Sequence, residues 1–257
     1  MNLKNSVGLV TGASQGLGKA FAEALLKKEA KVVLCDINHT QGAITKAEFD
    51  QKYGPGQSTF ITCDVTSQSQ LKDLFTKTVR KFGKLDILCN NAGINNENCW
   101  EKTISVNLMA LIQASYLALE HMRCDHGGKG GSIVNVASMS SFLPAAHAPA
   151  YTASKFGVLG FTRSIAEASR LGHYGIRINA LCPSFVNTCL LDTINHEETL
   201  GMFHQFKDTA KHLIDSVGIL DPSVVVDGFL QLIEDDSLNG AAMKITMSKG
   251  IHFENMI

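Results

Sequence analysis

LVTGASQGLGKAFAEAL, residues 9–25, is the stretch of the sequence that decides the fold. It begins as a short apolar strand, continues as a glycine-rich turn and ends in a run with helical spacing. Gly12, Gly16 and Gly18 are spaced more widely than in the common G-x-G-x-x-G pattern, but the physics is the same. Glycines let backbone N–H groups approach a pyrophosphate, which then rests on the helix N-terminus. An ordinary tight turn would also use glycines, so the surrounding sequence has to decide.

An acidic residue ends the second predicted strand, KVVLCD at residues 31–36. Asp36 stands where a dinucleotide fingerprint expects a carboxylate for the ribose hydroxyls. A carboxylate repels a 2′-phosphate, and neither residues 13–15 nor residues 37–38 contain an Arg or Lys to neutralise one. The sequence therefore predicts NAD rather than NADP. Asp64, after the third strand, is either a partner for the adenine amino group or a helix cap.

The rest of the chain alternates short β-branched runs with longer runs of helical period. Because such alternation indicates βαβ units, we expect an α/β protein with a Rossmann-type, doubly wound fold. Its seven-stranded, mostly parallel sheet would have helices on both faces. We predict one domain over residues 1–257, with a dinucleotide-binding part at about 1–140 and a catalytic and substrate part at about 138–257. The predicted strands are Val7–Thr11, Lys31–Cys35, Thr59–Cys63, Asp86–Asn90, Ser132–Ala137, Arg177–Cys182 and Met243–Met247. The predicted helices are Leu17–Lys28, Gln41–Tyr53, Ser67–Phe82, Trp100–Met122, Thr152–Leu171 and Pro222–Leu232.

The composition excludes several classes of function. The formal net charge of −1 comes without a basic block, which argues against a nucleic-acid partner. The start of the chain runs almost directly into a strand, and no apolar run approaches the length of a membrane span, so we expect a cytoplasmic protein. The dispersed Cys and His residues predict no metal site. Four cysteines near strand ends are expected to be buried in a reducing compartment: Cys35, Cys63, Cys89 and Cys182.

A tyrosine and a lysine four residues apart lie in HAPAYTASK, residues 147–155. Tyr151 and Lys155 could be an ordinary surface pair. However, other polar residues also lie near the predicted carboxyl ends of the strands, where ligands bind in parallel sheets. These are NNAG (90–93), Asn107 and Ser138. These residue types are the ones that the oxidation of an alcohol would need, because that reaction requires a base for the O–H proton. A nearby ammonium lowers the pKa of a phenol, and a neutral hydroxyl can orient the substrate oxygen.

With these motifs in this order and at this spacing, the chain resembles the short-chain dehydrogenases/reductases over essentially its whole length. The resemblance implies an NAD-dependent alcohol dehydrogenase with Asn107, Ser138, Tyr151 and Lys155 as catalytic residues. Asn107 would hold a water that links Lys155 to solvent, although a purely structural role for this amide stays open. The implied cofactor-binding residues are Gly12, Ser14, Gln15, Gly16, Leu17, Gly18, Asp36, Ile37, Cys63, Asp64, Val65, Asn91, Ala92, Gly93, Tyr151, Lys155, Val186, Asn187 and Thr188.

Further segments are similar to the branch of the family that oxidises the 15-hydroxyl of prostaglandins and related hydroxylated fatty acids. These segments include NNAGINNENCWEKT (90–103), CPSFVNT (182–188) and LIEDDSLNGAAMKITMSKGIHF (232–253). The implied substrate-binding residues are Ser138, His147, Ala148, Tyr151, Phe185 and Leu191. That branch has glutamines where this chain has His147 and Ala148. We therefore expect the substrate preference of this chain to differ from that of the branch.

The residues after Thr188 fit either a lipid pocket or core and subunit packing, because apolar side chains recur there at roughly helical spacing. These side chains are Leu190, Leu191, Ile194, Leu200, Phe203 and Phe206. Lys207, Lys211 or His212 could meet a lipid carboxylate or simply face solvent. Two alternative functions stay open, namely a dehydrogenase of another hydroxylated lipid or steroid and a non-catalytic NAD-binding module. By analogy with the family, we expect a homodimer or a tetramer built on the long helices that contain Asn107 and Tyr151.

Overall fold

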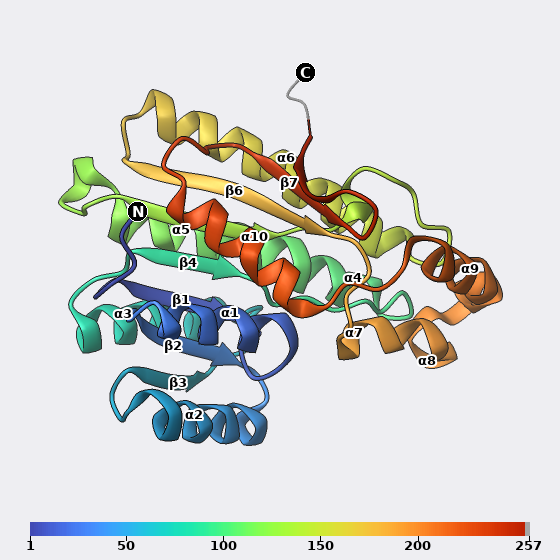
Figure 1. Ribbon diagram of the computed structural model, residues 1–257, viewed down its shortest axis with the longest axis horizontal. Coiled ribbons are helices and arrows are strands. Elements are labelled where there is room, and N and C mark those ends of the chain that lie inside the picture. The colour runs from blue at the N-terminus through green and yellow to red at the C-terminus, as the bar shows by residue number, and fades with distance from the viewer. Residues whose placement is uncertain (255–257) are drawn as a thin grey trace.

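The computed structural model describes residues 1–254, and in this part of the chain eight strands form one sheet (Figure 1). The strand order is β3-β2-β1-β4-β5-β6-β7-β8, and every pairing is parallel except that of β7 with β8. The order reverses between β1 and β4, which is where a doubly wound sheet binds its ligands. The strands are β1 (Val7–Thr11), β2 (Lys31–Asp36), β3 (Ser58–Thr62), β4 (Ile87–Asn90), β5 (Gly131–Val136), β6 (Ile176–Pro183), β7 (Ala242–Thr246) and β8 (Gly250–Phe253).

The predicted α/β fold is confirmed, and each of the seven predicted strands is present with ends that differ by one residue at most. The structure adds the short strand β8, which returns antiparallel along β7 through a tight turn. Gly250 begins β8 with a φ of +60°, a conformation that favours glycine. Four residues are too few to show a periodic pattern, so the sequence did not reveal this edge strand.

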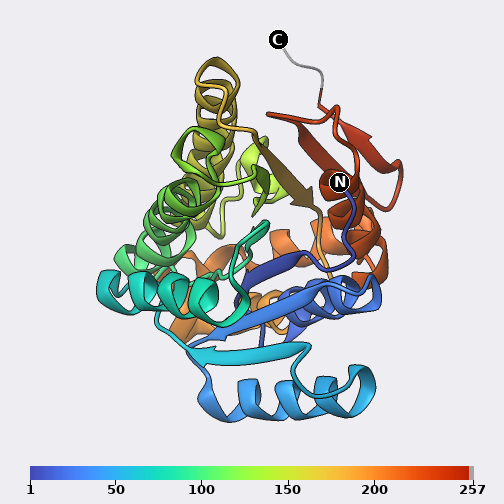
Figure 2. The same ribbon diagram turned by 90° about the vertical axis from the view of Figure 1, so that its left-hand side faces the viewer.

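Helices cover both faces of the sheet, as the sequence predicts, and each face has an apolar core beneath them. One core joins the sheet to α1, α2 and α10, and the other joins it to α3, α5 and α6. Figure 2 shows α1 and α10 on one side of the sheet and α5 and α6 on the other. The helices are α1 (Gly16–Lys27), α2 (His39–Tyr53), α3 (Gln68–Phe82), α4 (Trp100–Ile104), α5 (Ala110–Met122), α6 (Pro149–Leu171), α7 (Cys189–Asp192), α8 (Glu197–Leu200), α9 (Lys207–Val217) and α10 (Pro222–Glu234).

The predicted helix Trp100–Met122 is continuous but changes its winding in the middle. A π-helical turn at Ser105–Met109 separates α4 from α5 and contains Asn107. Such turns insert one residue into an α-helix and are frequent at functional sites. The π-helical turn thus changes the direction in which the Asn107 side chain points, compared with a regular α-helix.

The same helical run is the one segment within residues 1–254 that is long and apolar enough to cross a membrane, with a mean hydropathy of 1.2. This differs from the expectation that no segment approaches that length. Half of the apolar window is buried inside the protein, where Ala114, Ala118 and Leu119 pack in the core. A core helix passes the same test, so the absence of a membrane span stays a prediction.

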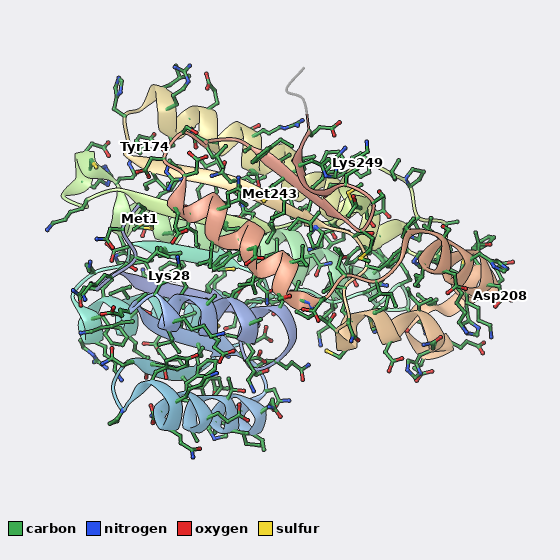
Figure 3. The ribbon with its side chains drawn as sticks, in the orientation of Figure 1. Met1, Lys28, Tyr174, Asp208, Met243 and Lys249 are labelled. Atoms are coloured by element: carbon green, nitrogen blue, oxygen red, sulfur yellow. The ribbon has the colours of Figure 1, made fainter. Side chains whose placement is uncertain are left out.

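Residues 189–217, hereafter the covering segment, contain the apolar side chains that recur at roughly helical spacing after Thr188. They fold into α7, α8 and α9, joined by short 3-10 turns. In Figure 1 these helices lie together at the edge of the sheet where the parallel strands end. Figure 3 places Asp208 of α9 there, whereas Met1 and Tyr174 lie toward the opposite edge. The covering segment therefore sits over the edge at which a ligand site is expected.

Phe229 of α10 packs on Phe21 of α1 in the core, with ring centroids 4.4 Å apart and both side chains fully buried. Phe229→Ala leaves a cavity, so we expect a loss of about 3–5 kcal/mol in the free energy of unfolding, measured by denaturant titration. Ile44→Ala, on the exposed side of α2, is the matched control and should change that free energy by about 0.5 kcal/mol or less. Equal losses in the two variants would contradict this account of the core.

Candidate active site

A cavity of about 660 Å³ lies at the carboxyl edge of the sheet, and the covering segment forms part of its lining. It brings together residues from both halves of the chain. Most of the residues proposed from the sequence border it: Gly12, Ser14, Gln15, Gly16, Leu17, Asp36, Ile37, Cys63, Asp64, Val65, Asn91, Ala92, Gly93, Ser138, His147, Ala148, Tyr151, Lys155, Phe185, Val186, Thr188 and Leu191. Gly18, Asn107 and Asn187 lie outside this lining, and their positions are described below.

The turn between β1 and α1 requires each of its three glycines. Gly12 and Gly16 have φ values of +64° and +55°, which side chains other than glycine rarely adopt. Gly18 lies behind the turn, where an added Cβ would stand 2.1 Å from the carbonyl oxygen of Gly12. The first turn of α1 borders the cavity through Gly16 and Leu17. The turn is therefore an open cradle of backbone at a helix N-terminus, which fits the pyrophosphate of a dinucleotide.

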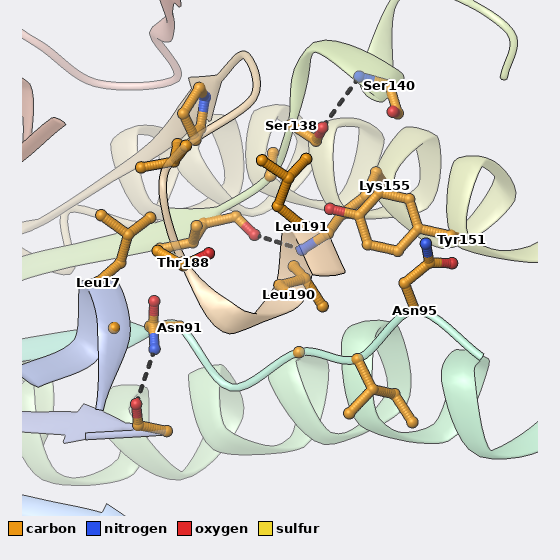
Figure 4. A pocket seen from close by; sticks show the side chains of 18 of the residues that line it. Leu17, Asn91, Asn95, Ser138, Ser140, Tyr151, Lys155, Thr188, Leu190 and Leu191 are labelled. Carbon is orange, nitrogen blue, oxygen red and sulfur yellow. Dashed lines mark hydrogen bonds between the residues drawn. The ribbon is translucent and has the colours of Figure 1, made fainter. Parts of the chain in front are cut away.

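The NNAG motif holds this cradle in place. The Asn91 side-chain amide donates hydrogen bonds to the carbonyl oxygens of Thr11 (2.9 Å) and Gly12 (3.1 Å), as Figure 4 shows for the second of them. The Thr11 hydroxyl oxygen accepts from the backbone N–H groups of Asn91 and Ala92, both at 3.0 Å. These four bonds join the ends of β1 and β4, the two strands that flank the reversal point.

Asp36 ends β2 with its carboxylate at the cavity. One oxygen accepts from the Ser14 backbone N–H at 3.0 Å and the other from the Asn38 N–H at 2.9 Å. Carboxylate oxygens have further lone pairs, so both remain able to accept from ribose hydroxyls. Because the carboxylate would repel a 2′-phosphate at this position, the site fits NAD better than NADP.

Asp64 borders the cavity, but its carboxylate bonds within its own turn. It accepts from the backbone N–H of Thr66 at 2.9 Å and from the Thr66 hydroxyl at 2.7 Å. The cap of α3 is Ser67, whose hydroxyl accepts from the Gln70 N–H. Asp64 is therefore not the helix cap that the sequence left open.

Tyr151, Lys155 and Ser138 meet at the inner end of the cavity (Figure 4). Tyr151 and Lys155 are one turn apart on α6, and the Lys155 ammonium lies 5.5 Å from the centre of the Tyr151 ring. The ammonium also donates a hydrogen bond of 2.8 Å to the carbonyl oxygen of Val136. Ser138 follows β5, and its hydroxyl oxygen accepts from the Ser140 backbone N–H at 3.1 Å. The arrangement places a phenol, an ammonium and a hydroxyl at one site.

Burial changes the acidity of the groups in this cluster. It raises the pKa of Tyr151, while contact with the Ser138 hydroxyl lowers that pKa in part. Burial also lowers the pKa of Lys155 to about 8, because desolvation disfavours its charged form. Tyr151 is thus a neutral phenol before the reaction, and Lys155 is still mainly an ammonium at neutral pH.

Asn107 lies behind the cluster and is only 1% exposed. Its oxygen accepts from the Ile94 backbone N–H at 2.8 Å, and its NH2 group donates to the Ile94 carbonyl at 2.9 Å and to the Ser154 hydroxyl at 3.2 Å. These bonds support the structural role that the sequence left open. The predicted water link to Lys155 stays a prediction.

The outer half of the cavity is apolar and is partly formed by the covering segment. Leu190, Leu191 and Ile194 border it as expected, whereas Leu200 is fully buried elsewhere and Phe203 and Phe206 lie outside the lining. The proposed carboxylate partners Lys207, Lys211 and His212 are also outside the lining. Sequence reasoning missed several lining residues. Lys102, Leu213 and Thr246 come from α4, α9 and the end of β7, and the others come from loops: Asn95, Leu143, Pro144 and Ser248.

Two residues before α6 distinguish the substrate half. His147 is 8% exposed, and burial lowers its pKa, so its ring is neutral near pH 7. Ala148, the N-cap residue of α6, is 1% exposed. Farther along the lining, the Asn187 backbone N–H donates to the Leu220 carbonyl at 3.1 Å, and its side chain is exposed. Asn187 therefore lies beside the cavity and not in it.

Cysteine placement agrees with the sequence. Cys35, Cys63, Cys89 and Cys182 are buried and have free thiols, as predicted. Within residues 1–254, no group of three or more His, Cys, Asp or Glu side chains is arranged to hold a metal ion.

Comparison with known proteins gives consistent results. The short chain dehydrogenase family matches residues 6–199. The chain is 52% identical to the 15-hydroxyprostaglandin dehydrogenase (NAD(+)) of Homo sapiens over 255 residues, which are 99% of this chain and 96% of that protein. Among solved structures, levodione reductase superposes with a TM-score of 0.83 at 27% identity, covering 96% of this chain and 98% of its own. A short chain dehydrogenase from Mycobacterium smegmatis has a TM-score of 0.75 at 29% identity, covering 95% and 92%.

Proposed function

Because this chain belongs to the short-chain dehydrogenase family, we propose that it uses NAD to oxidise a secondary alcohol to a ketone, namely the 15-hydroxyl of prostaglandins and related hydroxylated fatty acids. The observation that carries the proposal is the meeting of Tyr151, Lys155 and Ser138 in the cavity that also contains the glycine cradle. A base, a cation to assist it and a hydroxyl to orient the substrate are what alcohol oxidation needs.

The cofactor would occupy the part of the cavity formed by the first half of the chain. The N-terminus of α1 and the β1–α1 turn would hold the pyrophosphate, and Asp36 would bind the adenosine ribose. Ile37, Cys63, Asp64 and Val65 line the cavity beyond Asp36 and would border the adenine. Lys155 would hold the second ribose, with Val186 and Thr188 near the carboxamide. When bound, NAD accepts the hydride that leaves the alcohol carbon.

The side chains of the cluster divide the remaining chemistry. Ser138 donates a hydrogen bond to the substrate oxygen and orients it without competing for its proton. Tyr151 first releases its own proton to solvent, and the resulting tyrosinate takes the alcohol proton as the carbonyl forms, which leaves a neutral phenol again. The Lys155 ammonium stabilises the tyrosinate by its charge, and so lowers the pKa that burial would otherwise keep high.

The substrate would lie in the apolar half of the cavity. Leu191 and Phe185 offer contact surface, and His147 can donate or accept one hydrogen bond. Ala148 offers only a methyl group, and it is fully packed. Recognition therefore depends mainly on apolar contact, which suits a hydroxylated acyl chain.

Two further proposals concern the whole protein. We propose a cytoplasmic homodimer that pairs the outer faces of α5 and α6. Met109, Tyr116, Phe156 and Leu171 each expose between 46% and 64% of their surface on this helix pair and its π turn. Such a concentration of exposed apolar side chains supports an interface.

Tyr151→Phe removes the base and keeps the ring. With NAD and a 15-hydroxy prostaglandin, we expect the wild type to form NADH and the variant to lose about 100-fold or more in kcat, followed by absorbance. Tyr53→Phe is the control, because Tyr53 hydrogen bonds to Glu23 on α1, away from the cavity, and should leave kcat unchanged. A wild type that oxidises a steroid alcohol far faster than any 15-hydroxy lipid would contradict the substrate. Equal turnover in Tyr151→Phe would contradict the mechanism.

Asp36→Ser tests the choice of cofactor. The change removes two charged acceptors and the repulsion of a 2′-phosphate, so the preference for NAD over NADP, as a ratio of kcat/KM values, should fall about tenfold or more. Asp73→Asn, on the surface of α3, should leave the ratio unchanged. An unchanged ratio in Asp36→Ser would show that another group selects the cofactor.

A further inference from the structure

Glu97 is a buried carboxylate in the loop between β4 and α4, outside the lining of the cavity. Its side chain is 6% exposed, and both of its oxygens accept hydrogen bonds from consecutive backbone N–H groups of α6. One oxygen accepts from Ala150 and the other from Tyr151, each at 2.9 Å. A buried carboxylate that is aimed so specifically at the first turn of a helix calls for an explanation.

The start of α6 cannot satisfy its own N–H groups. Its N-cap residue is Ala148, whose methyl group accepts no hydrogen bond, and Pro149 follows at the first helical position. The first-turn N–H groups of any helix need acceptors, and a negative charge there also interacts favourably with the helix dipole. Glu97, from a loop outside α6, supplies both the acceptors and the negative charge. Its two hydrogen bonds are charge-assisted and therefore stronger than neutral ones.

The bond to the Tyr151 N–H gives this cap a direct relation to the reaction. Tyr151 belongs to the first turn of α6, so its backbone has no preceding helical turn to fix it. The Lys155 ammonium, one turn later, is fixed separately by its bond to Val136. The position of the phenol relative to the ammonium and to Ser138 therefore depends on the contact with Glu97.

The backbone of the same loop also contacts the covering segment. The N–H groups of Glu97 and Asn98 both donate to the Thr199 carbonyl oxygen, at 2.7 and 3.2 Å. The Asn98 side-chain amide donates to the Glu198 carbonyl oxygen at 3.2 Å. The Thr199 hydroxyl in turn donates to the carbonyl oxygens of Thr193 and His196, which ties α8 to the turn before it. One short loop thus contacts both the covering segment and the start of α6.

From these contacts we infer that Glu97 is a positioning residue for Tyr151, and that the loop of residues 95–98 couples the seating of the covering segment to the placement of the phenol. The inference rests on the proposed function, because it assigns Tyr151 as the base. When the covering segment is seated, its bonds to the loop hold Glu97 against α6. When it is displaced, the first turn of α6 loses an anchored acceptor.

The variant Glu97→Gln keeps the size of the side chain but offers one acceptor and turns an NH2 group toward the other N–H. We expect kcat with the 15-hydroxy prostaglandin to fall about 10- to 100-fold while the Kd for NADH, measured by fluorescence, stays unchanged. The primary deuterium isotope effect on kcat, with substrate deuterated at C15, should rise because hydride transfer becomes slower. Glu97→Asp, which retains the charge, should recover part of the loss. Glu101→Gln, an exposed position on α4, is the matched control and should behave as wild type.

Hydrogen exchange makes the test independent of turnover. In Glu97→Gln, the amides of residues 150–152 and 197–200 should exchange faster, whereas those at the end of α6 should not change. Unchanged exchange at residues 150–152 would overturn the inference whatever the activity. Faster exchange with an unchanged kcat and isotope effect would also overturn it, because Glu97 would then only stabilise the helix. A wild type without turnover would refute the proposed function, and exchange would still decide whether Glu97 anchors α6.

Discussion

The hydrogen bond from the Lys155 ammonium to the carbonyl oxygen of Val136 is the contact around which the site is organised. A cation that is only 4% exposed needs a fixed acceptor, and the end of β5 provides one. The bond ties α6 to the sheet and keeps a positive charge beside the Tyr151 ring. Because burial lowers the pKa of this lysine to about 8, the charge remains available at neutral pH but is not strongly held. A lysine that is charged at neutral pH but can also lose its proton suits this role, because it must stabilise the tyrosinate only while the proton is transferred.

Because its strands are parallel, the sheet brings the other residues of the site together at one edge. The ends of β1, β2, β4 and β5 deliver the glycine turn, Asp36, Asn91 and Ser138 to one edge. The bonds from Asn91 to the β1–α1 turn close the gap at the point where the strand order reverses. The second half of the chain adds α6 and the covering segment, so the cavity has a polar cofactor half and an apolar substrate half. Neither half forms a complete site without the other.

Much of this could be predicted from the sequence, for physical reasons that differ among the elements. The strands and long helices follow from local periodicity, and the three glycines follow from backbone geometry, so both were found. The strand β8 is too short to show a periodic pattern, and the helices of the covering segment depend on what they pack against, so neither was predicted. Glu97 gave no signal, because its partners Ala150 and Tyr151 lie more than fifty residues away and are backbone groups. Tertiary contacts to main-chain atoms leave no trace in residue type.

The pH dependence of kcat/KM in the wild type and in Lys155→Met tests the central claim most directly. Oxidation needs the deprotonated phenol, so kcat/KM should rise with pH through the pKa of Tyr151 in the working enzyme. Without the ammonium, the tyrosinate loses its stabilising charge, and the midpoint of that rise should move up by about one pH unit or more. Activity at pH 7 should fall accordingly and recover in part at high pH. A midpoint that is the same in both proteins would contradict the account, because the lysine would then not set the acidity of the base.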